Sequence, residues 1–397
     1  MSLYSFVPSV GAQRTRRQPI ISKQPAGSRV SFSQRHWHRV LRRCIGAIAI
    51  AATLIAQPAL AQPAPCSTTG SQFLGEGGDA SFSPDGKLLA YEQPDAKGIS
   101  HLYASAPDGT GKVCLSCQVA PSRNVLQSAW SPDGQWLITT READNNPLAA
   151  LGWSGQTWVT ELEENGLWTD IWAVKPDGSQ WTKLTNVSVL TTDGDMSPSF
   201  SRDGQHVVWS ELTANAGQSD PWGTYRLVLA DFVVTNGTPA LQNVRNITPT
   251  LPGHFFESNG FSPDGSKVLF ASDSGALTLS SINVWSLDLA SGKATNLTND
   301  WGWNEHATYT PDGSKIVFFN ASWPLVGDLW EINPDGTGKV QLTHFNTPGY
   351  PEYDPKPGMA ITPSFAPDGS KLAITYQLAL TYPERQLFVL GFAGSCG

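Results

Sequence analysis

Histidine and carboxylate side chains recur in the second half of the sequence, and they are the residues best suited to acid–base or metal chemistry. His254 precedes Glu257 by three positions, and Glu305 is followed directly by His306. Imidazole nitrogens and carboxylate oxygens bind divalent metals and exchange protons near neutral pH. Their spacings fit no compact metal-binding motif. The pattern therefore does not decide whether a metal ion binds, and it predicts no cofactor.

The cysteines indicate disulfide bonds. Beyond residue 61 they are Cys66, Cys114, Cys117 and Cys396, an even number that suits an exported protein. Cys114 and Cys117 form a C-L-S-C motif, which is either a redox pair or a local structural bond. A redox pair usually opens a helix beside a βαβ unit, and the surrounding residues predict none. We therefore expect a local disulfide there, and no zinc site, because two further ligands are missing.

A hydrolytic nucleophile has no visible motif. The stretch GWSGQ at 152–156 is not a G-x-S-x-G elbow, which would follow a strand and open a helix. We also find no cofactor-binding glycine loop and no paired-carboxylate signature. These observations favour a chain that binds rather than one that catalyses, although they leave an enzyme possible.

A repeated phrase must position all of these residues. It occurs six times, as in SFSPDGK and GFSPDGS, and its register is marked by Asp85, Asp133, Asp203, Asp264, Asp312 and Asp368. Proline sets φ for the first central position of a type I turn, aspartate suits the second, and glycine then takes the left-handed conformation. The third copy has Arg202 in place of proline, and we expect its turn to form nevertheless.

Each turn lies in a pattern of four strands. An aromatic precedes the turn (Phe82, Trp130, Phe200, Phe261, Tyr309, Phe365), and β-rich runs such as KVLFAS and NVWSLDL follow it. A second turn leads to a fourth strand that carries Leu or Ile before Thr or Ser (Leu115, Leu184, Ile247, Leu297, Leu342). The fold class is therefore all-β, a six-bladed β-propeller of four-stranded antiparallel blades, with the aromatics filling the gaps between blades.

The sixth repeat ends after three strands, which predicts how the ring closes. The segment SQFLGEGGD precedes the first repeat and resembles an unpaired fourth strand, with Phe73-Leu74 in the place of Leu-Thr. We expect this N-terminal strand to complete the last blade. Cys66 and Cys396 would then lie close enough to form a disulfide.

Residues 1–61 are predicted to be a signal peptide with a long basic n-region, and 62–397 a single propeller domain. The first 61 residues hold nine of the 26 Lys and Arg and no Asp or Glu. An apolar run, CIGAIAIAATLIA, ends in a small-residue cleavage site. This run is too short and Ala-rich to favour a stable membrane span after cleavage, although a retained anchor is the alternative. The protein is thus expected to be periplasmic or secreted.

The remaining chain is strongly acidic. It holds 17 basic and 34 acidic residues, a net charge of about −17. Such a surface repels nucleic acid and anionic membranes. We therefore predict no nucleic-acid partner.

The Ser-Pro-Asp-Gly turns with flanking aromatics, and the Leu-Thr pair of the fourth strand, resemble the TolB-type propellers of bacterial envelopes. Similar repeats form the propeller of prolyl-oligopeptidase-type proteases. The resemblance covers about residues 70–397 and implies the fold rather than an activity. TolB itself carries an α/β domain before its propeller, and we expect none here, nor the hydrolase domain of the proteases.

The P-D-G turns occupy one face of the predicted propeller, so the irregular segments share the other face. The longest are 141–168, 211–225, 321–327 and 345–362. Long loops on a rigid scaffold often bind ligands. The approaches to the first strands should ring the central channel there: Gly78-Asp79, Gln127-Ser128, Met196-Ser197, Ser258-Asn259, Glu305-His306 and Ile361-Thr362, with Asp195, His254 and Glu257 nearby.

Three interpretations of this polar ring remain open: a solvated mouth, a site for a peptide, protein or glycan, or a metal site using His254, His306, Glu257 or Glu305. Tryptophans beside the loops either bind a ligand or hold the loop against its blade. The candidate binding residues are Asp79, Gln127, Asp195, Glu257, Asn259, Glu305, His306, Trp153 and Trp303.

We predict an exported, non-catalytic binding or scaffold propeller that engages a protein, peptide or envelope polymer through its loop-rich face. The alternative is a metal-assisted polysaccharide lyase or hydrolase with its site at the channel mouth. Some TolB-like propellers, the oligogalacturonate lyases, hold a metal there with histidines. Convergence of His254 and His306 on a carboxylate would favour the enzyme.

Overall fold

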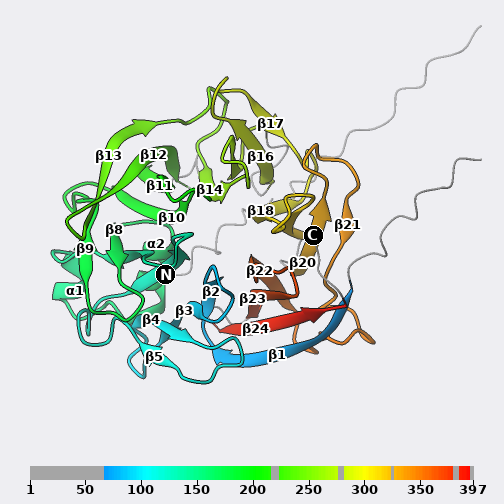
Figure 1. Cartoon of the computed structure of the whole chain (residues 1–397), viewed down its shortest axis with the longest axis horizontal. Coiled ribbons are helices and arrows are strands. Elements are labelled where there is room, and N and C mark those ends of the chain that lie inside the picture. The colour runs from blue at the N-terminus through cyan, green and yellow to red at the C-terminus, as the bar shows by residue number, and fades with distance from the viewer. Residues whose placement is uncertain (1–66, 216–222, 276–280, 323–325, 379–383, 394–397) are drawn as a thin grey trace, which may run out of the picture. The chain divides into compact units, whose positions relative to one another are not determined.

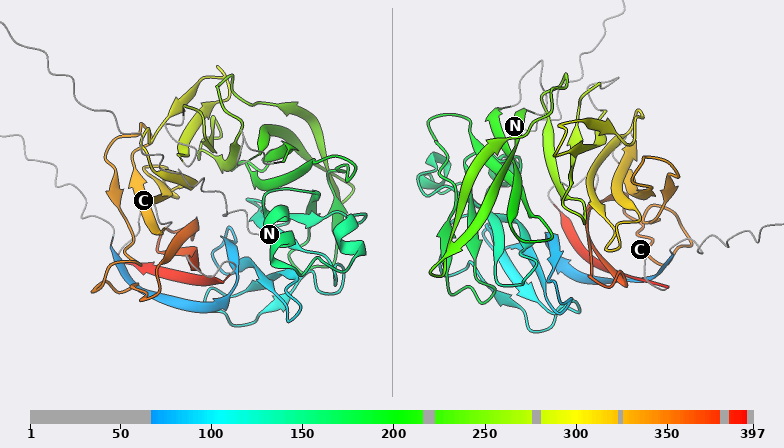
Figure 2. Two further views of the ribbon diagram at one scale, coloured as in Figure 1. Left: turned by 180° about the vertical axis from the view of Figure 1, so that it is seen from behind. Right: turned by 45° about the horizontal axis from the view of Figure 1, so that its top comes forward.

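A computed structural model of the chain describes residues 67–215, 223–275, 281–322, 326–378 and 384–393. All of them belong to one compact unit, Pro65–Gly397. They form a β-propeller of antiparallel sheets around a common centre (Figures 1 and 2). No helix in these ranges is both long and apolar enough to span a membrane.

Four of the sheets have four strands each, joined in chain order. They are β2 (Gly78–Phe82), β3 (Leu89–Pro94), β4 (Ser100–Ser105) and β5 (Val113–Cys114); β6 (Val125–Trp130), β7 (Leu137–Glu142), β8 (Thr169–Val174) and β9 (Trp181–Lys183); β10 (Gly194–Phe200), β11 (His206–Ala214), β12 (Thr224–Thr235) and β13 (Thr238–Asn246); β14 (Phe256–Phe261), β15 (Lys267–Ser272), β16 (Asn283–Asp288) and β17 (Ala294–Asn296).

A fifth sheet of eight strands contains both ends of the described chain. Its members are β18 (Trp303–Tyr309), β19 (Ile316–Ser322), β20 (Val326–Ile332), β21 (Val340–Gln341), β22 (Gly358–Phe365), β23 (Lys371–Leu378), β24 (Arg385–Phe392) and β1 (Thr68–Glu76). The groups β18–β21 and β22–β24 meet at one parallel pair, Gly327 and Met359.

The N-terminal strand pairs with the last strand, as the sequence predicts. β1 runs antiparallel to β24 from Thr68 opposite Phe392 to Glu76 opposite Gln386, and the two lie side by side in Figure 1. The Ala393 N–H also donates to the Ser67 carbonyl at 3.2 Å. Cys66 and Cys396 lie outside the described residues, so their disulfide stays a prediction.

The repeated phrase forms the predicted hairpin turn. The Gly86 N–H donates to the Ser83 carbonyl at 2.8 Å, and the Asp85 carboxylate accepts the Ser83 hydroxyl at 2.8 Å. Gly86 has φ of 70°, in the left-handed region that only glycine enters readily. The copy with Arg202 closes in the same way, since Gly204 also has φ of 70°.

The Leu-Thr pair, or its Ile or Ser variant, follows each of the fourth strands β5, β9, β13, β17 and β21. The Leu115 N–H donates to the Leu102 carbonyl at 2.8 Å, and the next hydroxyl, that of Ser116, accepts the Leu102 N–H at 3.0 Å. The hydroxyl accepts the third-strand N–H that a backbone carbonyl of the fourth strand would otherwise accept. The fourth strand can therefore end here without leaving that N–H unpaired. The other copies are Ile171 with Thr185, Leu227 with Thr248, Val284 with Thr298 and Leu329 with Thr343.

The aromatic before each turn packs against the preceding sheet, which confirms its predicted place. Phe82, for example, shares a core cluster with Ala373 of β23, and Trp130 shares one with Leu102 of β4. Phe200, Phe261, Tyr309 and Phe365 lie in the corresponding clusters. The first strands also contact one another in the order β2, β6, β10, β14, β18, β22 and again β2.

Candidate functional site

The first strands share a bulge at their centre-facing residues. Five of them carry a non-glycine residue with positive φ three positions before the aromatic: Asp79, Gln127, Ser197, His306 and Thr362. We call these the bulge residues. In β14 the positive φ falls instead on Gly260, directly before Phe261. The pairing register shifts at each of these places, and such a bulge redirects the side chains beside it.

Polar contacts at the bulges join neighbouring sheets. The Ser197 N–H donates to Oε1 of Gln127 at 2.8 Å, across from β10 to β6. Asn259 accepts the Ala307 N–H at 3.1 Å, and the Asp79 N–H donates to the Thr375 hydroxyl at 2.9 Å. At these positions, polar contacts therefore hold neighbouring sheets together.

Glu257, Glu305 and His306 form a cluster between β14 and β18. Nε2 of His306 lies 3.9 Å from a carboxylate oxygen of each glutamate. Ligand-type atoms of all three residues lie within 4.8 Å of one another. The Ser197 hydroxyl donates to Glu257 at 3.2 Å, and the indole N–H of Trp303 donates to Glu305 at 2.7 Å. Two carboxylates and one imidazole are thus held in fixed positions.

Burial raises the pKa of Glu257 well above its usual value, and the neighbouring Glu305 carboxylate raises it further. Burial and the neighbouring carboxylate thus both disfavour the charged form of Glu257, and a cation beside it would offset that cost.

His254 does not join this cluster. Its side chain is exposed, and its backbone N–H donates to Asp273 at 3.0 Å. Within the described ranges, the carboxylate cluster gathers one histidine rather than two. The convergence of His254 and His306 that would favour a lyase or hydrolase is absent, because His254 precedes β14 while His306 lies within β18.

Asp195 is a buried structural residue. One carboxylate oxygen accepts the indole N–H of Trp209 at 2.9 Å, and the side chain is 3% exposed. Burial raises the pKa of Asp195 to about 7. This aspartate was expected near the channel mouth; its carboxylate accepts from Trp209 of its own sheet, and its carbonyl accepts the Thr169 hydroxyl of β8 at 2.6 Å.

Replacing Asp195 by asparagine should flatten the pH dependence of stability. A carboxyl whose folded pKa is raised stabilises the protein below its unfolded pKa, near 4, and loses that contribution as pH rises to about 7. The wild-type free energy of unfolding should therefore fall over this range, by up to about 4 kcal/mol from this group. For Asp195→Asn, the free energy of unfolding measured with urea at pH 5 and at pH 8 should therefore differ less than it does for the wild type.

The matched control for this variant is Asp193→Asn. Asp193 lies two positions away and is half-buried, accepting the Thr191 hydroxyl at 2.7 Å. Its variant should keep the wild-type slope. Equal slopes for Asp195→Asn and the wild type would contradict the assignment.

A second charged cluster was missed by sequence reasoning. Arg385 of β24 lies 2.8 Å from Glu92 and 3.8 Å from Asp79, and it also contacts Glu164. Burial raises the pKa of Glu92 well above its usual value, with the nearby Asp79 charge adding to it. These four residues come from two sheets and an insertion, and Arg385 is 293 positions from Glu92 in the sequence, so no local sequence pattern predicts the cluster.

A cavity of about 300 Å³ opens beside Arg385. Its lining residues are Glu76, Gly77, Gly78, Glu92, Pro94, Asp95, Gly98, Ser100, Gly155, Thr160, Glu164, Glu384 and Arg385. They come from connections between second and third strands and from the approach to β2. The cavity therefore lies on the face that the sequence predicts to be loop-rich.

The insertion between β7 and β8 builds one wall of this cavity. It contains two short helices, α1 (Pro147–Ala150) and α2 (Thr157–Glu164), where the sequence suggested an irregular loop. Buried polar contacts anchor it: the Asn124 amide donates to Ser154 at 2.6 Å and to Glu163 at 2.7 Å. A loop held by buried hydrogen bonds has a defined shape.

The predicted tryptophans divide between the two roles. Trp153 is 43% exposed and Trp301 69% exposed. Trp303 is half-buried, packs against two core clusters and orients Glu305. Trp222 and Trp323 lie outside the described residues.

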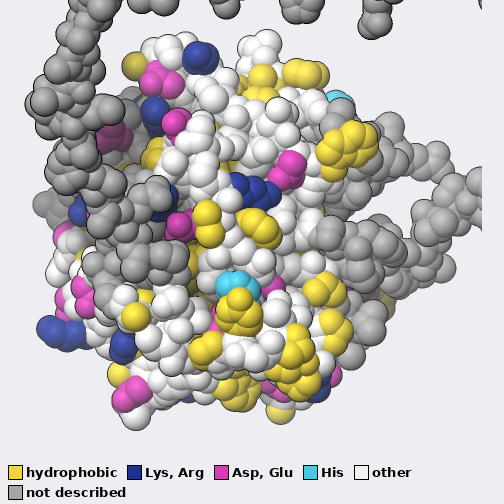
Figure 3. All heavy atoms as spheres, turned by 90° about the vertical axis from the view of Figure 1, so that its right-hand side faces the viewer, with side chains coloured by type: hydrophobic (Ala, Val, Ile, Leu, Met, Phe, Trp, Pro, Cys, Tyr) yellow, Lys and Arg dark blue, Asp and Glu magenta, His cyan; other side chains and the backbone are white. Residues whose placement is uncertain are grey.

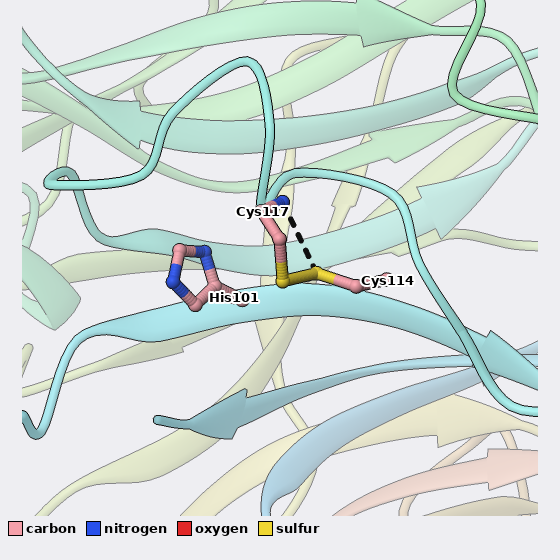
Figure 4. A group of neighbouring side chains, drawn as sticks. All are labelled: His101, Cys114 and Cys117. Atoms are coloured by element: carbon pink, nitrogen blue, oxygen red, sulfur yellow. Dashed lines mark hydrogen bonds between the residues drawn. A yellow bond between two sulfur atoms is a disulfide. The ribbon is translucent and has the colours of Figure 1, made fainter. Parts of the chain in front are cut away.

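Cys114 and Cys117 form the predicted local disulfide (Figure 4). His101 lies beside it, and Nδ1 of this histidine is 3.1 Å from the Ser116 hydroxyl. A thiolate is needed to ligate zinc, and disulfide-bonded sulfurs offer none. This group is therefore a structural element in the oxidised protein.

The sequence matches no established family model. It is 22% identical to dipeptidyl-peptidase 5 of Porphyromonas gingivalis over 257 residues, covering 62% of this chain and 33% of that protein. It is 27% identical to the Tol-Pal system protein TolB of Francisella tularensis over 149 residues, 34% of this chain and 30% of that one. The chain thus matches about a third of the length of these curated relatives.

A TolB structure from Acinetobacter baumannii is similar to this one with a TM-score of 0.49 at 16% identity, over 79% of this chain and 66% of that chain. The sequence matches to TolB proteins agree with the turns and aromatics described above. The chain is a TolB-like β-propeller.

Proposed function

We propose that this protein is an exported, non-catalytic binding propeller, periplasmic or secreted, whose loop-rich face receives a segment of a protein or peptide. The acidic cavity beside Arg385 is the observation that carries the proposal. It lies on the face built from the variable connections, and one wall is an insertion fixed by buried hydrogen bonds. Binding sites are commonly such preformed hollows with few polar groups.

The charge of the cavity indicates the chemistry of its ligand. Five carboxyl groups line it, from Glu76, Glu92, Asp95, Glu164 and Glu384, against one guanidinium among the described lining residues. Arg385 is already paired with two of them, so it leaves an excess of negative charge. A lysine or arginine side chain of a peptide would complement this hollow.

The scaffold we propose is a closed ring of six blades, with β1 completing the last one. The pairing of β1 with β24 and the contact of β22 with β2 support this closure. Such a ring would hold the cavity walls, which belong to its first, second and last blades, in one rigid body. On the side surface drawn in Figure 3, apolar side chains lie in small groups among polar atoms.

Neutralising exposed acids of the cavity should weaken the binding of basic peptides. Glu76 and Glu384 are both exposed lining residues, so Glu76→Gln/Glu384→Gln should fold normally. We expect short Lys- or Arg-containing synthetic peptides to bind the wild type in fluorescence polarisation, with affinity falling as salt rises. The double variant should bind them about three- to tenfold more weakly, since each charge contributes a fraction of a kcal/mol at this exposure.

The control variant is Glu331→Gln, a half-buried carboxylate on β20 outside the cavity. It should leave peptide affinity unchanged. Acidic peptides of equal length should not bind. Failure of all basic peptides, or binding of glycans alone on an array, would contradict the proposal.

Catalysis is the weaker alternative. A metal-assisted lyase or hydrolase was predicted to show two histidines beside a carboxylate, and among the described residues His254 stands apart from the His306 cluster. The relatives that are peptidases by name match the chain over about a third of their own length. We therefore place the function in binding.

A further inference from the structure

We propose that Glu257, Glu305 and His306 form a binding site for one first-row divalent cation, such as Zn²⁺ or Mn²⁺. This site is separate from the acidic cavity, because none of its three residues lines that cavity. Metal binding at this site can therefore be tested independently of peptide binding in the cavity.

The bulge in β18 creates the site. Neighbouring residues of a regular strand point to opposite faces of the sheet, so Glu305 and His306 would ordinarily diverge. The register shift between Glu305 and Thr308, with φ of 53° at His306, breaks that alternation. Both side chains can then approach Glu257 of β14, the adjacent first strand.

The spacing suits an ion with short bonds to nitrogen and oxygen. Nε2 of His306 is 3.9 Å from oxygen atoms of both glutamates. Ligands about 2.0–2.2 Å from a tetrahedral ion lie about 3.4 Å apart, so a shift of about 0.5 Å would close the site. An imidazole with two carboxylates favours Zn²⁺ or Mn²⁺ over Ca²⁺, which prefers a shell of oxygens.

The buried glutamate is the independent indication that a ligand belongs here. Glu257 is 5% exposed, and its Oε2 has no hydrogen-bond partner among the described residues. A buried carboxylate oxygen without a partner is costly. A cation beside Oε2 would satisfy it and neutralise the pair formed with Glu305.

Outer contacts hold the ligands in place. Ser197 donates to Oε1 of Glu257, and the indole of Trp303 donates to Oε2 of Glu305. Metal-binding carboxylates typically have such partners, which set their orientation. Trp303, a candidate ligand-binding residue by sequence, acquires a different role as the support of Glu305.

The test is metal titration of the full, tag-free protein after chelator treatment and dialysis. Isothermal titration calorimetry with MnCl₂ and with ZnCl₂ should show one ion per chain, and the melting temperature should rise with the ion. Glu257→Gln, Glu305→Gln and His306→Gln should each weaken binding about tenfold or more. Mn²⁺ electron paramagnetic resonance on the His306→Gln protein should show loss of the bound signal.

His254→Gln and His101→Gln are matched controls, because neither histidine belongs to the cluster; both should bind as the wild type does. If Glu257→Gln fails to fold, His306→Gln decides the result, since His306 is partly exposed. Absence of binding of either ion would overturn the proposal. So would binding of Ca²⁺ alone, or unchanged binding in the His306 variant.

Discussion

A chain that begins at Gly77, and so lacks β1, should lose more than about 3 kcal/mol of unfolding free energy and should aggregate. β1 pairs with β24 over its length, and Leu74 packs against a core cluster that includes Phe82 and Leu387. Without β1, the backbone of β24 becomes an open edge, which pairs readily with other chains. Urea unfolding and size-exclusion chromatography measure the two effects.

The control is a chain that begins at Ser67, which keeps β1 and the Ser67–Ala393 hydrogen bond. It should unfold cooperatively and elute as a single species. Leu74→Asp in that background should reproduce part of the loss without shortening the chain. A Gly77 chain with the same urea midpoint as the Ser67 chain would show that β1 contributes no stability.

Arg385→Met should destabilise the protein by about 3–5 kcal/mol, the range seen when one partner of a buried ion pair is removed. Arg385 is 15% exposed and faces carboxylates of Asp79, Glu92 and Glu164. Glu92 is 4% exposed and would be left without its cation. Urea unfolding at pH 7 measures the loss.

Two further variants separate charge from packing at Arg385. Arg226→Met removes an exposed arginine from its pair with Glu211 and should cost at most about 1 kcal/mol. Arg385→Met combined with Glu92→Gln should recover part of the stability, because the buried carboxylate is then neutral. Equal losses for the Arg385 and Arg226 variants would contradict the view that the cluster is buried and coupled.

The parts of the fold that depend on local chemistry could be predicted from sequence. The Pro-Asp-Gly turns, the aromatic before each turn and the Leu-Thr pair each involve residues within one hairpin, so their spacing is visible in the chain. The approach to each first strand follows from the same register, which is why Asp79, Gln127 and His306 were named as candidates. The pairing of β1 with β24 was predicted from the missing fourth strand of the last repeat.

The site itself was only partly predictable. Glu257, Glu305 and His306 were candidates, but the bulge that brings Glu305 and His306 to the same side has no sequence signal of its own. Arg385 was missed because its partners lie in distant segments. The burial of Asp195 was not predicted, because alternation along β10 cannot distinguish a buried carboxylate from one facing solvent.

The pairing of the two ends of the chain bears on how the protein folds. Contacts such as that of Asp79 with Thr375 span 296 residues, and chains rich in such distant contacts fold slowly because a long loop must close before the contact forms. If the protein crosses a membrane in an extended state and β1 emerges first, β1 cannot pair until β24 has also crossed. During that interval β1 would remain an unpaired strand, which a chaperone could shield, so the late pairing of β1 with β24 is a step exposed to misassembly.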